Sequence, residues 1–176
     1  MRLGSLPIDS EQGLRFVQDR IALFSRTTFL ISSIFLVATS AADLLATVAR
    51  YSLVARTCHV LATLIALGTW RVAASARLLS PEALQKFDLC LTLGACWSFA
   101  AMGHLAQQPY GSYTGLLAVT HVSITRAMIV PSLPRRTLLL AVLGFAFPLL
   151  SRAVVALPPE LSQLPGARVR GSSRRS

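Results

Sequence analysis

Seven ionisable side chains lie inside long apolar segments or at their ends, and any chemistry of this chain would depend on them: Asp43, His59, Asp88, His104, His121, Arg126 and Arg152. Ionisable groups are costly in hydrocarbon and often mark ion pathways, proton relays or ligand sites. A proton pathway would usually place several acids along one helix face. Asp43 and Asp88 lie on different segments, so transport or proton conduction is the alternative function rather than the first.

His104 and His121 could bind haem or a metal if antiparallel helices brought them to the same depth. Counting along the two segments places them at unequal levels, so hydrogen-bonded or interface histidines are the simpler interpretation, and we expect no cofactor and no metal. Asp43 is expected to pair with Arg56 or His59 across a short turn. Four of the seven side chains lie within about two turns of a segment end and can extend toward water: His59, Asp88, Arg126 and Arg152.

The motifs of soluble enzymes are absent from the chain. It has no Gly-rich phosphate loop, no HExxH and no GxSxG sequence. We therefore predict no catalytic residue. The candidate polar residues within the membrane are Asp43, His59, Asp88, His104 and His121.

Composition indicates what must position these residues. The chain has 176 residues, of which 53% are hydrophobic and only 14% charged, and its mean hydropathy is +0.60. The charges cluster between long apolar blocks, whereas a soluble domain would spread them. The net charge of +10 comes from arginines in short loops, so a nucleic-acid partner is not predicted.

The apolar blocks predict an all-α, polytopic membrane bundle of about five transmembrane helices. Crossing about 30 Å of hydrocarbon takes about 20 apolar residues. The expected membrane domain is 27–157, with spans at about 27–48, 53–70, 87–106, 114–130 and 137–157, and Ser80-Pro81-Glu82 is a helix start before the third span. Gly94, Ala101 and Gly103 offer small surfaces for close helix contact. Pro148 should kink the fifth span, and residues 158–176 should form a basic disordered tail.

Residues 1–26 are predicted to be a polar lead followed by an amphipathic helix. Leu14, Val17, Ile21 and Phe24 recur at helical spacing, and Glu11, Arg15, Gln18 and Arg26 are expected on the opposite face. Two interpretations remain open. The helix can lie on the inner surface of the membrane, or it can pack against its own bundle.

The positions of basic residues predict the orientation. If the N-terminus is cytoplasmic, ten basic residues lie on the inner side of the membrane, before or between the spans, and two, Arg50 and Arg56, lie outside. The inner set includes the residues that we expect to set the topology: Arg71, Arg77, Lys86, Arg126, Arg135 and Arg136. Five spans would place the arginine-rich tail outside, against this trend. The hairpin at 129–140 carries two prolines and Arg135 and Arg136, so it should turn the chain at the inner surface.

Three segments resemble the membrane-spanning region of multi-span serine/threonine protein kinases of the myxobacterial type. They are RIALFSRTTFLISS (20–33), LLSPEALQKFD (78–88) and VPSLPRRTLLL (130–140), and the similarity extends over about residues 10–157. The family pattern continues into a further helix and a cytoplasmic kinase domain, which this sequence lacks. The resemblance implies a non-catalytic membrane anchor or sensor module for signal transduction in a bacterial inner membrane. Its expected partners are the lipid bilayer, a second copy or other membrane helices.

Overall fold

The structure is a computed structural model that describes residues 10–45, 52–105 and 111–156. Within these ranges the chain forms five α-helices, α1 (Glu11–Leu45), α2 (Leu53–Ala73), α3 (Pro81–Leu105), α4 (Gly111–Ile129) and α5 (Pro134–Ala156). The all-α prediction is confirmed, and each predicted span corresponds to one helix. The predicted tail lies outside the described residues, as do residues 1–9.

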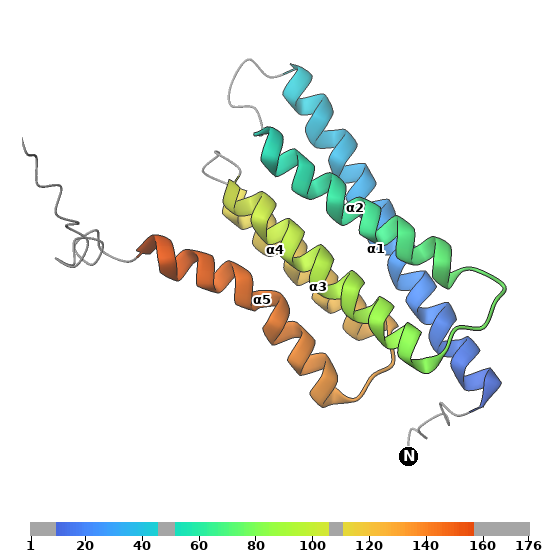
Figure 1. Ribbon diagram of the computed structural model, residues 1–176. Coiled ribbons are helices and arrows are strands. Elements are labelled where there is room, and N and C mark those ends of the chain that lie inside the picture. Colours follow the sequence, from blue (N-terminus) through green and yellow to red (C-terminus); the bar gives the residue numbers. More distant parts are fainter. Residues whose placement is uncertain (1–9, 46–51, 106–110, 157–176) are drawn as a thin grey trace, which may run out of the picture.

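Helix α3 is the centre of the bundle, because it contacts each of the other four helices. Its flanks are covered by α2 and α4, while α1 packs on α2 and reaches α4, and α5 lies against α3 and α4 (Figure 1). The core is therefore richest around α3, where Leu91, Ala95 and Cys96 are fully enclosed.

Local signals explain where the helices begin. The hydroxyls of Ser10, Ser52 and Ser80 accept hydrogen bonds from the backbone N–H three residues later, at 3.0, 3.1 and 3.2 Å, as helix N-caps do. Pro81 and Pro134 occupy the first position of α3 and α5, where a missing N–H is not needed. Pro134 thus starts a helix, and the turn itself is confined to residues 130–133. Helix α5 remains helical across Pro148 and bends between its two halves (Figure 1).

The prediction of a separate N-terminal helix is wrong, because α1 runs unbroken from Glu11 to Leu45. No proline or glycine occurs between Gly13 and Leu45 to end it. Its first turns pack against the bundle, with Ile21 and Phe24 enclosed. Gln18, which was expected on the solvent face, is 1% exposed.

Gln18 fastens the connection between α2 and α3. Its Nε2 donates to the carbonyls of Ala73, Ser75 and Arg77 at 3.0–3.2 Å, and its Oε1 accepts from Leu79 N at 3.0 Å. A loop leaves several backbone groups unpaired, and burial of such groups is costly unless they find partners. One amide side chain supplies four of these partners, so α1 holds the loop in place.

Close contacts between α3 and α4 depend on glycine. A Cβ added to Gly115 would lie 3.0 Å from both Gly103 Cα and Phe99 O. The sequence predicted Gly103 as a contact surface without identifying its partner on α4. Gly94 lies instead against Ile65 of α2.

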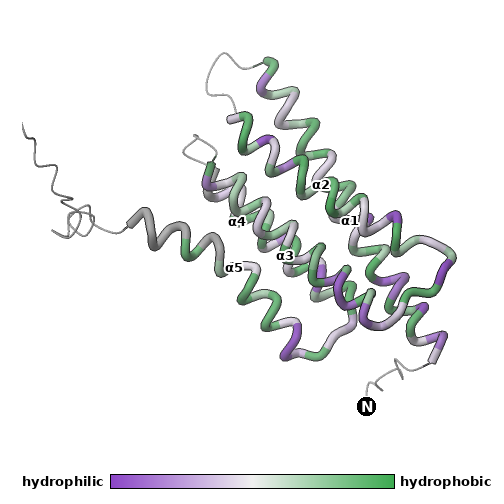
Figure 2. Tube along the Cα trace, viewed as in Figure 1, coloured by the Kyte–Doolittle hydropathy of each residue, from purple (hydrophilic) through white to green (hydrophobic). Residues whose placement is uncertain are grey.

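The two ends of the bundle differ in polarity. Hydrophilic residues gather where α1, α3 and α5 begin, and apolar residues cover the bodies of the helices (Figure 2). We call the first region the basic end, and the opposite region, where α1 finishes and α2 begins, the Asp43 end. Within the described residues two helices, α1 and α2, are long and apolar enough to cross a membrane.

Candidate functional site

A buried ion pair joins α3 to α4 at the basic end. Arg126 donates from Nε to Asp88 Oδ1 at 2.9 Å and from Nη2 to Asp88 Oδ2 at 2.8 Å. The two side chains are only 2% and 3% exposed. A bidentate guanidinium–carboxylate pair combines two charge-assisted bonds with fixed geometry, so the pair fixes the relative position of the two helices.

The α4–α5 hairpin closes over this pair. Arg136 Nη2 donates to Asp88 Oδ2 at 3.1 Å and to the Gln85 carbonyl at 3.3 Å. Ser132 and Thr137 share a hydrogen bond of 2.6 Å and both lie within 3.5 Å of the Arg126 guanidinium. The group of two arginines and one aspartate carries a net charge of +1 (two positive charges less one negative), and it links α3, α4 and α5.

This arrangement corrects the expectation that Asp88 and Arg126 reach toward water. Both are enclosed, because they lie at matching depths on adjacent antiparallel helices and each neutralises the other. The sequence contained a signal for the pair: Asp88 lies about two turns from the start of α3, and Arg126 lies in the last turn of α4, at the same end of the bundle. The topology-setting residues Arg71, Arg77, Lys86 and Arg135 are exposed at the same end.

At the Asp43 end, Arg56 of α2 donates from Nη2 to Asp43 of α1, which confirms the predicted pair. The Arg56 side chain is 39% exposed and that of Asp43 11% exposed. His59 faces inward instead, with Nε2 placed 3.1 Å from the Ser32 carbonyl and its ring edge against Phe99. Ser32 and Thr63 complete the α1–α2 contact with a hydroxyl–hydroxyl bond of 2.6 Å.

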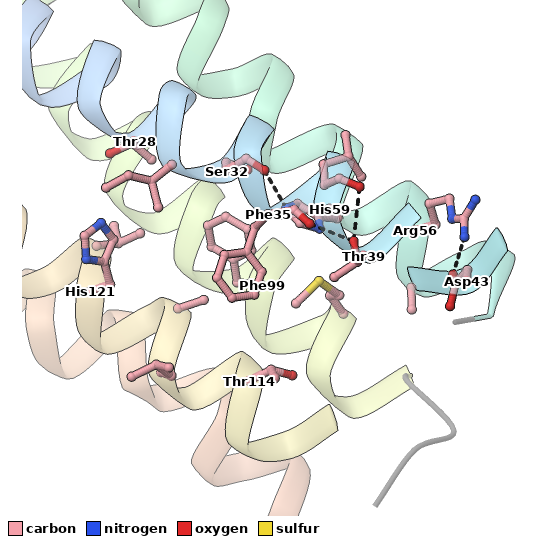
Figure 3. A pocket seen from close by; sticks show the side chains of 17 residues that line it. Thr28, Ser32, Phe35, Thr39, Asp43, Arg56, His59, Phe99, Thr114 and His121 are labelled. Carbon is pink, nitrogen blue, oxygen red and sulfur yellow. Dashed lines mark hydrogen bonds and ion pairs between the residues drawn. The ribbon is translucent and has the colours of Figure 1, made fainter. Parts of the chain in front are cut away.

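A cavity of about 300 Å³ lies between these groups and α4. Its wall is mainly apolar and is formed by α1, α2, α3 and α4. Figure 3 shows the Asp43–Arg56 pair at one end, His59 and Phe99 in the middle, and Thr28 opposite His121 at the other end. The cavity thus has a charged end, an apolar body and a polar floor.

The candidate polar residues do not converge on one site. Asp43, His59 and His121 line the cavity, Asp88 lies in the network at the basic end, and His104 is exposed at the end of α3. His121 is 3.5 Å from the Thr125 hydroxyl on its own helix. Among the described residues no group of three His, Cys, Asp or Glu side chains could hold a metal ion. The side chain of Arg152 lies outside the described set.

Sequence reasoning missed two structural features of the bundle, the enclosed network around Arg126 and the cavity. Comparisons with protein-family models, with curated proteins and with solved structures find no match. The chemistry of the two sites therefore carries the functional argument.

Proposed function

We propose that this chain is a non-catalytic integral membrane module, of the anchor or sensor kind, whose five helices all cross a bacterial inner membrane with the N-terminus in the cytoplasm. The observation that carries the proposal is the exposure of large apolar side chains on every helix. Ile34, Val54, Leu117 and Leu138 are each more than half exposed, and so are Leu44 and Leu149. Apolar surface on this scale fits hydrocarbon as its solvent rather than water.

The buried ion pair supports membrane spans for α3 and α4 as well. Asp88 lies about two turns inside α3 and Arg126 lies in the last turn of α4, and a lone charge at either position would be costly in hydrocarbon. Asp88 and Arg126 satisfy each other, however, so the pair enters the bilayer with its charges compensated. The concentration of exposed arginines at the basic end favours that end as the cytoplasmic one.

A sensor role, rather than transport, is supported by the separation of the two sites. The cavity lies toward one membrane surface, and the rigid network at the other surface links three helices. Helix α1 extends past both sites, so a conformational change at the cavity can be transmitted along this continuous helix to the basic end. In this proposal the chain serves a cytoplasmic kinase domain, as the resemblance implies. That domain belongs either to a longer parent protein or to a partner.

Cysteine labelling tests the topology. In a background with Cys58, Cys90 and Cys96 replaced by serine or alanine, Tyr113→Cys should react with a membrane-impermeant maleimide on intact cells. Ser75→Cys should react only after the membrane is opened, and reaction of the opened sample is the control for both sites. The reverse pattern would invert the orientation. Equal labelling of both sites on intact cells would show that α3 does not cross the membrane.

The non-catalytic assignment has its own test. The purified chain should hydrolyse no ATP. Hydrolysis that disappears in Asp88→Asn while the variant remains folded would contradict it.

A further inference from the structure

We propose that the cavity binds a long-chain amphiphile with an anionic headgroup, its hydrocarbon chain between α1 and α4 and its headgroup at Arg56. This inference rests on the proposed function and gives the sensor module a class of ligand. The carboxylate of a fatty acid and the phosphate of a lysophospholipid share the required chemistry.

The shape of the cavity fits a single linear chain. Its wall on α1 follows one helix face from Thr28 through Phe35 to Asp43. At 1.5 Å per residue this face is about 22 Å long. A volume of about 300 Å³ along such a length leaves a narrow channel. An extended hydrocarbon chain suits a cavity of this length and volume.

The cavity opens sideways toward the surrounding hydrocarbon. Ile31 and Phe35 of α1 and Leu117 of α4 all contribute to its wall, and they are 37%, 51% and 65% exposed. Residues that line a cavity and also face outward mark its opening, which therefore lies between α1 and α4. A chain can enter there from the lipid without crossing water.

The accessible charge at the Asp43 end of the cavity is positive. Asp43 is shielded at 11% exposure, whereas Arg56 is 39% exposed. A guanidinium has five N–H donors, and the pair with Asp43 uses Nη2 only. The remaining donors suit an oxyanion, so the headgroup is assigned a carboxylate or a phosphate.

The far end of the cavity adds a second polar requirement. The Thr28 hydroxyl is buried, has no hydrogen-bond partner among the described residues and lies across from His121 (Figure 3). A buried hydroxyl without a partner is unfavourable, and a ligand that brings an oxygen to this floor removes the penalty. We therefore expect a chain with a terminal hydroxyl to bind more tightly than the plain chain.

The experiment uses the full chain in nanodiscs of zwitterionic lipid and measures binding of radiolabelled palmitate. Palmitate should bind, and Arg56→Gln should weaken its affinity by at least about tenfold, as expected for a lost charge-assisted bond. Arg71→Gln, which removes an exposed arginine at the opposite end, should leave the affinity unchanged. Thr39→Trp should fill the channel and abolish binding. Val37→Trp on the outward face of the same helix is its control.

Three competitors define the ligand. Palmitoyl lysophosphatidic acid that displaces the label more strongly than palmitate would indicate a phospholipid source, and the reverse a free fatty acid. Methyl palmitate should compete at least about tenfold less well. ω-Hydroxypalmitate should compete better than palmitate, and Thr28→Val should remove that advantage.

Two results would overturn the inference. One is the absence of palmitate binding, and the other is equal competition by methyl palmitate together with an unchanged affinity in Arg56→Gln. If Thr39→Trp does not fold, the competition by palmitate compared with that by methyl palmitate still tests the inference. If palmitate binding fails but the cysteine labelling is as predicted, the proposed membrane module is retained and only this ligand is rejected. Failure of the labelling would instead reject the proposed function.

Discussion

Each end of the bundle holds an arginine–aspartate pair, but the two pairs differ in burial and in contact geometry. At the basic end Arg126 and Asp88 are enclosed, doubly bonded and covered by Arg136. At the Asp43 end Arg56 contacts the carboxylate through Nη2, and the Arg56 side chain is 39% exposed. The enclosed pair holds three helices together, whereas exposure leaves the Arg56 guanidinium accessible to a ligand.

The surroundings of the two pairs reinforce the difference. Around the basic end, Gln18 binds the α2–α3 loop and the hairpin closes over Asp88. Around the Asp43 end, α1 and α4 leave a cavity between them. The comparison predicts that substitutions at the basic end reduce the stability of the fold, while those at the Asp43 end mainly affect binding.

Asp88→Asn gives the largest expected effect. It leaves the Arg126 guanidinium enclosed without its counter-charge, and breaking a buried pair in this way costs about 3–5 kcal/mol. The measurement is unfolding of the purified protein in mixed maltoside and dodecyl sulphate micelles. The double variant Asp88→Leu with Arg126→Met should recover much of the loss, because no enclosed charge remains without a partner, and Arg136, which also loses Asp88, is 34% exposed and can be hydrated. A double variant as unstable as the single one would show that the network contributes more than charge neutralisation.

Gln18→Leu is expected to destabilise the protein by about 2–3 kcal/mol, because it removes the partners of three carbonyls and one N–H. The same unfolding assay measures it. Gln12→Leu, an exposed glutamine on the same helix, is the matched control and should change stability by no more than about 0.5 kcal/mol. Equal effects of the two substitutions would show that the α2–α3 loop does not depend on α1.

Apart from the division of α1 near residue 26, the sequence predicted the helices because apolar runs, prolines and serine caps are local signals. It predicted that Asp43 would pair with Arg56 or His59 for the same reason, since only a short turn separates Asp43 from them, and Arg56 is the partner. It missed the partner of Asp88 because Arg126 is 38 residues away along the chain. The burial of Gln18 was missed because the hydrophobic pattern treats every glutamine as a surface residue. The cavity depends on how far α1 stands from α4, and no local pattern encodes that spacing.

Gly115→Ala tests the close contact of α3 and α4 near the Asp43 end. Its new Cβ would meet backbone atoms at 3.0 Å, which cannot move aside as a side chain can, so a loss of about 1–2 kcal/mol is expected. Gly68→Ala is the control: nothing lies within 4 Å of its added Cβ, and alanine favours the helix by about 1 kcal/mol. The two substitutions should shift the thermal unfolding midpoint in opposite directions. A shift in the same direction would contradict the packing of α4 on α3.

Asp43→Asn gives the smallest expected effect and sharpens the comparison most directly, because it is the same chemical change as Asp88→Asn at the other end. The Arg56 side chain is more than a third exposed, so water and salt screen the pair, and the expected loss is below about 1 kcal/mol. Raising the ionic strength should reduce the difference between wild type and Asp43→Asn. The deficit of Asp88→Asn should be insensitive to salt. A salt-independent loss at Asp43 as large as that at Asp88 would show that both pairs fasten the bundle. The Asp43 end would then hold no charge available to a ligand.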